Sequence, residues 1–117
     1  MKLPNSERLF IPEEKLEGYA LNASHKVGSH KARLFRAMFD LTSENASVLR
    51  KALIEAATQS EDARYTLTDN YGAKYVLEFE LATEKGKGII FSSWMIRHGE
   101  DFPRLTSCYP LKKKGRK

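Results

Sequence analysis

The chain has 117 residues, of which 41% are hydrophobic and 30% are charged, and its net charge is +5. This length suits one domain, and no apolar run approaches the roughly 18 residues that a membrane-spanning helix needs, so we expect a soluble protein without a membrane partner. Its single cysteine, Cys108, excludes an internal disulfide and is typical of a reducing, cytoplasmic location.

The positive charge is concentrated at the C-terminus. The last six residues, KKKGRK, hold five of the 20 Lys and Arg, so residues 1–111 carry 15 basic and 15 acidic groups. We therefore expect a single, formally neutral α+β domain over 1–111 and a basic, disordered tail over 112–117. The tail is interpreted as a solubilising extension, and an RNA-binding or targeting role stays open. A phosphate site in the domain itself must come from local clustering of charge.

Three helices are predicted before residue 60. Residues 12–21 suit a short helix with Pro12 at its first position. A loop over 22–29 ends at Ser29, a good N-cap, and residues 30–40 follow as a helix. Its apolar residues recur at helical spacing: Leu34, Phe35, Met38 and Leu41.

The next helix, over residues 44–59, has the strongest pattern of the three. Thr42 or Ser43 supplies its cap, and a stripe of apolar residues runs along one side. The members of this stripe are Val48, Leu49, Ala52, Leu53, Ala56 and Ala57.

From residue 64 the hydrophobic period falls from about 3.6 to 2, which predicts strands. Four are expected, at 64–68, 73–81, 89–97 and 104–111, with turn residues between them. We therefore predict an α+β fold with N-terminal helices packed on one face of a four-stranded antiparallel β-meander. The other face of this sheet should be partly open.

The stretch SHKVGSHK, residues 24–31, contains Ser-His-Lys twice. On the helix beginning near residue 30, Lys31 lies along the apolar stripe, so its side chain either snorkels past the core or is held in a cleft. His25 and Lys26 precede it in the predicted loop, where a histidine can exchange protons at neutral pH. Lys31 and His25 are the stronger candidates for a site, Arg33 adds charge beside them, and His30 is the weaker candidate.

The last two predicted strands add polar side chains that a core does not need. If the two strands pair around the loop at residues 98–103, one face of the sheet presents arginine side chains, hydroxyl groups and an aromatic ring. Such groups can hold a phosphate and stack on a base. The residues in question are Ser92, Ser93, Trp94 and Arg97 on one strand and Arg104, Thr106, Ser107 and Tyr109 on the next. The alternative for each is a solvated face, with Trp94 anchoring the core.

Several segments carry a resemblance: LPNSER at the start, LNxxHxxGxHKARLF at 21–35, YGAKYVLEFEL at 71–81 and WMIRHGEDFPRLTSCY at 94–109. They resemble a bacterial domain family of unknown function, whose members are small stand-alone proteins or C-terminal modules of toxin-like chains. The order of helices and strands also resembles the ribonuclease superfamily of barnase, the colicin tRNA-cleaving domains and RelE. Those enzymes are metal-independent, which implies that no metal or other cofactor is needed.

The sequence and the resemblance together suggest a toxin-like, metal-independent ribonuclease domain that uses the 2′-hydroxyl of RNA as nucleophile. The expected catalytic residues are His25, Lys31, Arg97, Arg104 and Thr106. The expected substrate-binding residues are Lys26, Arg33, Trp94, Ser107 and Tyr109. Expected partners are RNA, such as tRNA or mRNA, and a cognate antitoxin or immunity protein. The alternative is a non-enzymatic module that binds nucleic acid or a partner protein with the same face.

Overall fold

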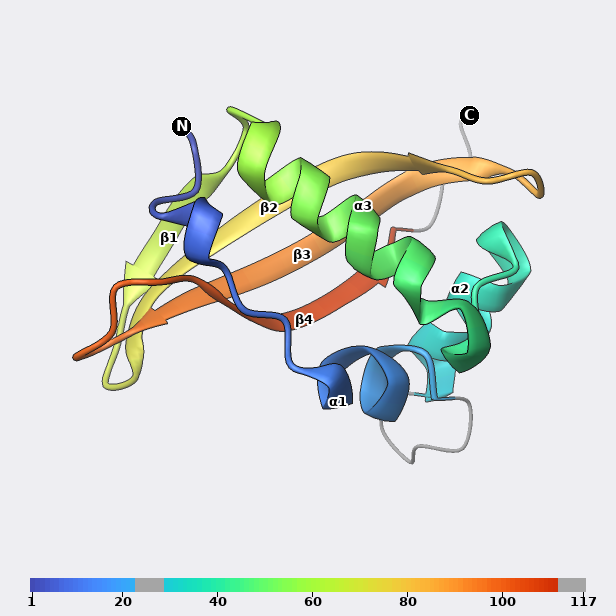
Figure 1. Ribbon diagram of the computed structural model, residues 1–117, viewed down its shortest axis with the longest axis horizontal. Helices are drawn as coiled ribbons and strands as arrows, with labels where there is room; N and C mark the ends of the chain where they lie inside the picture. The colour runs from blue at the N-terminus through green and yellow to red at the C-terminus, as the bar shows by residue number, and fades with distance from the viewer. Residues whose placement is uncertain (23–28, 112–117) are drawn as a thin grey trace.

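The computed structural model describes residues 1–22 and 29–111 of the chain, apart from the side chains of Tyr19 and Ser29. Helical segments come first and strands follow (Figure 1). The helical segments are η1 (Ser6–Arg8), α1 (Glu13–Lys15), η2 (Leu16–Ala20), α2 (Ser29–Phe39), η3 (Ser43–Asn45) and α3 (Ala46–Gln59). The strands are β1 (Arg64–Thr68), β2 (Gly72–Ala82), β3 (Lys87–Arg97) and β4 (Arg104–Pro110).

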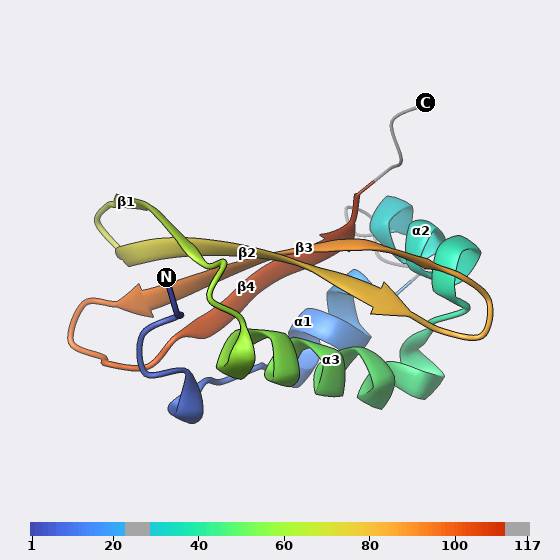
Figure 2. The same cartoon turned by 90° about the horizontal axis from the view of Figure 1, so that it is seen from above.

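The four strands form one antiparallel sheet in the order β1-β2-β3-β4, so the predicted α+β meander is confirmed. α1 and α3 lie against one face of this sheet, and α2 lies beside the end of β4 (Figure 2). No helix of the described ranges covers the opposite face. We call its β3 and β4 part the bare face, made of Phe91, Ser93, Met95, Arg104, Thr106, Ser107 and Tyr109.

The core lies between the helices and the covered face of the sheet. Alternation along β3 directs Ile90, Ser92 and Trp94 into it, and all three are fully buried. The Trp94 indole donates a hydrogen bond of 3.0 Å to Ser92 Oγ, which in turn donates one of 2.7 Å to the Leu77 carbonyl. The polar groups of Ser92 and Trp94 therefore both have partners, and Trp94 is a structural residue of the core.

The turn between β1 and β2 depends on Asp69 and Gly72. Asp69 Oδ1 accepts hydrogen bonds from the backbone N–H groups of Tyr71 and Gly72, at 2.8 and 3.2 Å. Gly72 has φ of +153°, and a Cβ on it would lie 2.1 Å from the Ile96 carbonyl oxygen. Only glycine allows β2 to begin this close to the end of β3.

Two helix predictions need correction. The helix predicted over 12–21 is a short turn, α1, followed by the π-helical η2, in which Leu21 N donates to the Leu16 carbonyl. This wider turn buries both Leu16 and Leu21. On α3, Leu49, Leu53 and Ala57 are buried as predicted and the two other alanines of the stripe are partly buried. Val48 is 42% exposed because it lies at the edge of the stripe.

Capping of the α3 region follows the prediction more closely. The Glu44 N–H donates to Thr42 Oγ1, and the Thr42 N–H donates to Asn45 Oδ1 at 2.7 Å. A short 3-10 turn, η3, then leads into α3. None of the described helices has both the length and the apolar character needed to cross a membrane.

Candidate functional site

The first part of the candidate site joins α2 to the end of β4. Lys31 lies in the first turn of α2, is half-buried, and holds its ammonium 4.9 Å from the centroid of the Tyr109 ring. Tyr109 is itself stacked on Phe91 of β3, with ring centroids 4.9 Å apart and planes at 28°. The prediction that Lys31 faces inward from the helix is therefore confirmed, and its charge lies over the sheet.

A β-bulge on β4 places two hydroxyl groups two and three residues before Tyr109. The register of β3 and β4 shifts between Ser93 and Trp94, so both Thr106 and Ser107 lie opposite Ser93. Thr106 Oγ1 donates to the Ser93 carbonyl at 3.0 Å, and its oxygen lies 2.7 Å from Ser93 Oγ. These two hydroxyls hold the bulge together, whereas Ser107 Oγ makes no hydrogen bond to a described residue.

Cys108, next to Tyr109 near the end of β4, has a buried thiol with a shifted pKa. Burial raises the pKa of its thiol to about 12, and the positive charge of Lys31 lowers this pKa by a smaller amount. The thiol is therefore protonated at neutral pH and is no nucleophile. The contact of the Lys31 ammonium with Tyr109 places this charge next to the residue that follows Cys108 on β4.

Arg104 occupies a different place on the same strand. Its guanidinium lies 5.2 Å from the Phe10 ring centroid and 5.3 Å from that of Phe102, and it pairs with Glu100 at 2.9 Å. Arg104 precedes Tyr109 by five residues, which is about 17 Å along a strand at roughly 3.4 Å per residue. The structure thus separates Arg104 from Lys31.

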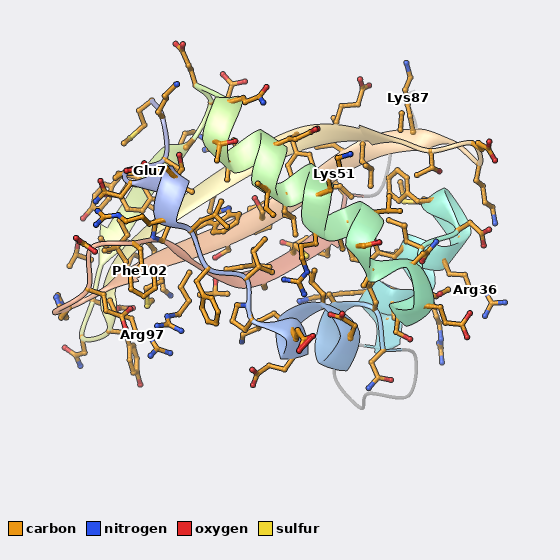
Figure 3. All side chains as sticks on the ribbon, viewed as in Figure 1. Glu7, Arg36, Lys51, Lys87, Arg97 and Phe102 are labelled. Carbon is orange, nitrogen blue, oxygen red and sulfur yellow. The ribbon has the colours of Figure 1, made fainter. Side chains whose placement is uncertain are left out.

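Two more predicted site residues do not join Lys31. Arg97 is distant from it, and Trp94 faces the core. Arg97 is exposed at the end of β3 and lies at the opposite end of the molecule from Arg36 of α2 (Figure 3). Trp94 is fully buried on the covered face and offers no ring to a ligand. The predicted grouping of Trp94 with both arginines is corrected, because Trp94 pairs with Leu105 toward the core.

The remaining predicted residues divide into two groups. Arg33 is exposed on α2, and at about 100° per residue it lies on the side of the helix away from Lys31. His25 and Lys26 lie outside the described residues. The site brought together by the fold therefore consists of Lys31, Tyr109 and Ser107, with Thr106 behind them.

One residue of this arrangement, Phe91, was missed from the sequence. Phe91 holds the ring of Tyr109, and Ser93 holds Thr106. The alternation of β3 offers a signal. Phe91 and Ser93 are two residues apart, so they lie on the same face of the strand, opposite to that of Trp94.

The groups of this site suit an anion. An ammonium and nearby hydroxyl groups can surround a phosphate, with charge-assisted hydrogen bonds as the stronger contacts. Within residues 1–22 and 29–111, no three His, Cys, Asp or Glu side chains gather as metal ligands would.

Comparison with known families adds to this geometry. Residues 2–112 match the model of a family described as a domain of unknown function, DUF6883. The chain belongs to the DUF6883 family. This result confirms the expected membership in a domain family without an established function, and the match spans all the strands of this DUF6883 domain.

Among solved structures, the DUF6883 domain is similar to a chain of the "Contact-dependent growth inhibition toxin - immunity protein complex from Klebsiella pneumoniae 342". The TM-score is 0.63 at 15% sequence identity, and the match covers 86% of this chain and 98% of the other. At this identity the likeness establishes a shared fold. No curated protein sequence matches the chain.

Proposed function

We propose that this domain is a toxin-like, metal-independent ribonuclease that cleaves RNA on the bare face at its α2 end. The observation that carries the proposal is the Lys31 ammonium above the ring of Tyr109, two residues along β4 from Ser107. A half-buried cation next to hydroxyl donors on an uncovered sheet suits a phosphodiester. The fold shared with a chain of a toxin–immunity complex supports a toxin-like role.

The proposed reaction needs proton transfer and charge stabilisation. The 2′-oxygen bonds to the adjacent phosphorus as the bond from phosphorus to the 5′-oxygen breaks, which leaves a 2′,3′-cyclic phosphate and a 5′-hydroxyl. A base removes the 2′ proton, and an acid protonates the departing 5′-oxygen. We assign one of these proton transfers to His25, four residues before Ser29 in the sequence.

Lys31 has the electrostatic role in this proposal. Negative charge grows on the non-bridging phosphate oxygens in the transition state, and a positioned ammonium stabilises it. Ser107 and the Tyr109 hydroxyl donate to the same phosphate. Thr106 acts through the bulge that it forms with Ser93, so we treat it as a positioning residue.

Two residues expected to be catalytic receive no catalytic role in this proposal. Arg97 and Arg104 have no part at the reacting phosphate because they lie toward the other end of β3 and β4.

The proposed substrates are cellular RNAs, such as tRNA or mRNA, reached in the cytoplasm. The proposed protein partner is a cognate immunity protein or antitoxin that prevents this cleavage.

Cleavage of RNA in EDTA tests the proposal. We expect the purified protein to produce fragments that end in 2′,3′-cyclic phosphate, because the 2′-hydroxyl is the nucleophile. DNA of the same sequence, which lacks this hydroxyl, should stay intact. RNA that is bound but never cut, with binding that weakens steeply as salt rises, would contradict the enzyme and favour a non-enzymatic binding module.

A further inference from the structure

The outward side of α2 carries a second group of cations. Arg33 and Arg36 follow Lys31 by two and five residues. At about 100° per residue they lie about 160° and about 140° from Lys31 around the helix axis, which is the far side of the helix. Both are exposed, whereas Lys31 is half-buried. The two arginines are one turn apart and are therefore neighbours on the helix surface.

The α2 sequence has no acidic residue to balance these charges, although Glu44 of η3 lines the same hollow as Arg36. No Asp or Glu occurs between Glu17 and Asp40 in the sequence. Arg8, Arg50 and Arg104 each pair with a carboxylate, whereas no ion pair joins Arg33 or Arg36 to a described residue.

A cation from another element adjoins this surface. The Lys85 ammonium, from the turn between β2 and β3, donates a hydrogen bond of 3.4 Å to the Arg36 carbonyl. Lys85 therefore places a third cation near the end of α2 that holds Arg36, in a hollow that Asp40 and Glu84 also line.

We propose that Arg33 and Arg36, with Lys85 beside them, bind the phosphate backbone of the RNA outside the scissile bond. This inference rests on the proposed function and deepens it, because it makes a longer RNA a better substrate than a dinucleotide. Guanidinium groups bind phosphates in a forked geometry. RNA is favoured over an acidic protein because the same helix presents Lys31 to the candidate site, so one strand can contact both sides of α2.

The test compares two substrates, a dinucleoside monophosphate and a longer single-stranded RNA. We expect Arg33→Ala and Arg36→Ala each to raise KM for the longer RNA by about three- to tenfold, with a smaller effect on kcat, since each removes one phosphate contact. Each change should also lower the slope of log KM against log salt by about 1. Cleavage of the dinucleoside should change far less. Lys51→Ala, on the exposed side of α3, is the matched control (Figure 3).

Equal losses on both substrates would overturn the inference, because the arginines would then act at the reacting phosphate. No loss on either substrate would also overturn it, and the surface would then suit an acidic protein. If the wild type cuts neither substrate, the proposed function fails, and binding of 2′-O-methyl RNA decides the inference separately. Weaker binding by the Arg33→Ala, Arg36→Ala double variant supports it, and unchanged binding overturns it.

Discussion

Replacing Lys31 by alanine should lower the rate of RNA cleavage at least about tenfold, and up to about a thousandfold if it acts like a preorganised oxyanion donor. The Lys31 ammonium lies over the ring of Tyr109. The substitution removes this charge where the phosphate would gain negative charge in the transition state. Single-turnover cleavage with enzyme in excess measures the effect on the chemical step.

Lys51→Ala supplies the control for this experiment, because Lys51 is an exposed lysine on α3. It removes the same charge from the protein and should leave the rate unchanged. Thermal unfolding of both variants shows whether the fold is kept. Cleavage by a folded Lys31→Ala variant at the wild-type rate would contradict the assignment of the site.

Replacing Trp94 by alanine should destabilise the domain by about 3–5 kcal/mol, the usual cost of removing a large aromatic side chain from a core. Trp94 is fully buried, and its indole donates to Ser92 Oγ. The truncation leaves a cavity and removes a hydrogen bond to a buried hydroxyl. Urea unfolding followed by circular dichroism measures the change in the free energy of unfolding.

Tyr71→Ala is the matched control for Trp94, since Tyr71 is an aromatic residue that is 72% exposed. Its truncation should change stability by no more than about 0.5 kcal/mol, as is usual at the surface. If Trp94→Ala does not fold, Trp94→Phe keeps a ring in the core and should show a smaller loss. Wild-type stability in Trp94→Ala or Trp94→Phe would contradict the placement of Trp94 in the core.

The sheet could be predicted from the sequence because its alternation is regular. Leu77 and Leu81 of β2 are buried, while Glu78 and Glu80 between and beside them are exposed, as a period of 2 requires. A helical period likewise placed Lys31 on the inward side of α2. These patterns depend only on local geometry.

The candidate site was harder to predict because it depends on pairing between strands. The bulge at Thr106 and Ser107 changes the register by one residue, and no local signal marks it. Distance along a strand was the second difficulty. Arg104 and Tyr109 belong to one predicted strand, yet they lie near its opposite ends, so residues that looked like one site occupy two places.

The most direct test of the central claim is an NMR titration of the protein with 2′-O-methyl RNA, which cannot be cleaved through its 2′-oxygen. The account predicts the largest backbone amide shifts at Lys31, Ser107 and Tyr109, at the α2 end of the bare face. Shifts confined to the other end of the sheet, around Arg97 and Arg104, would contradict it.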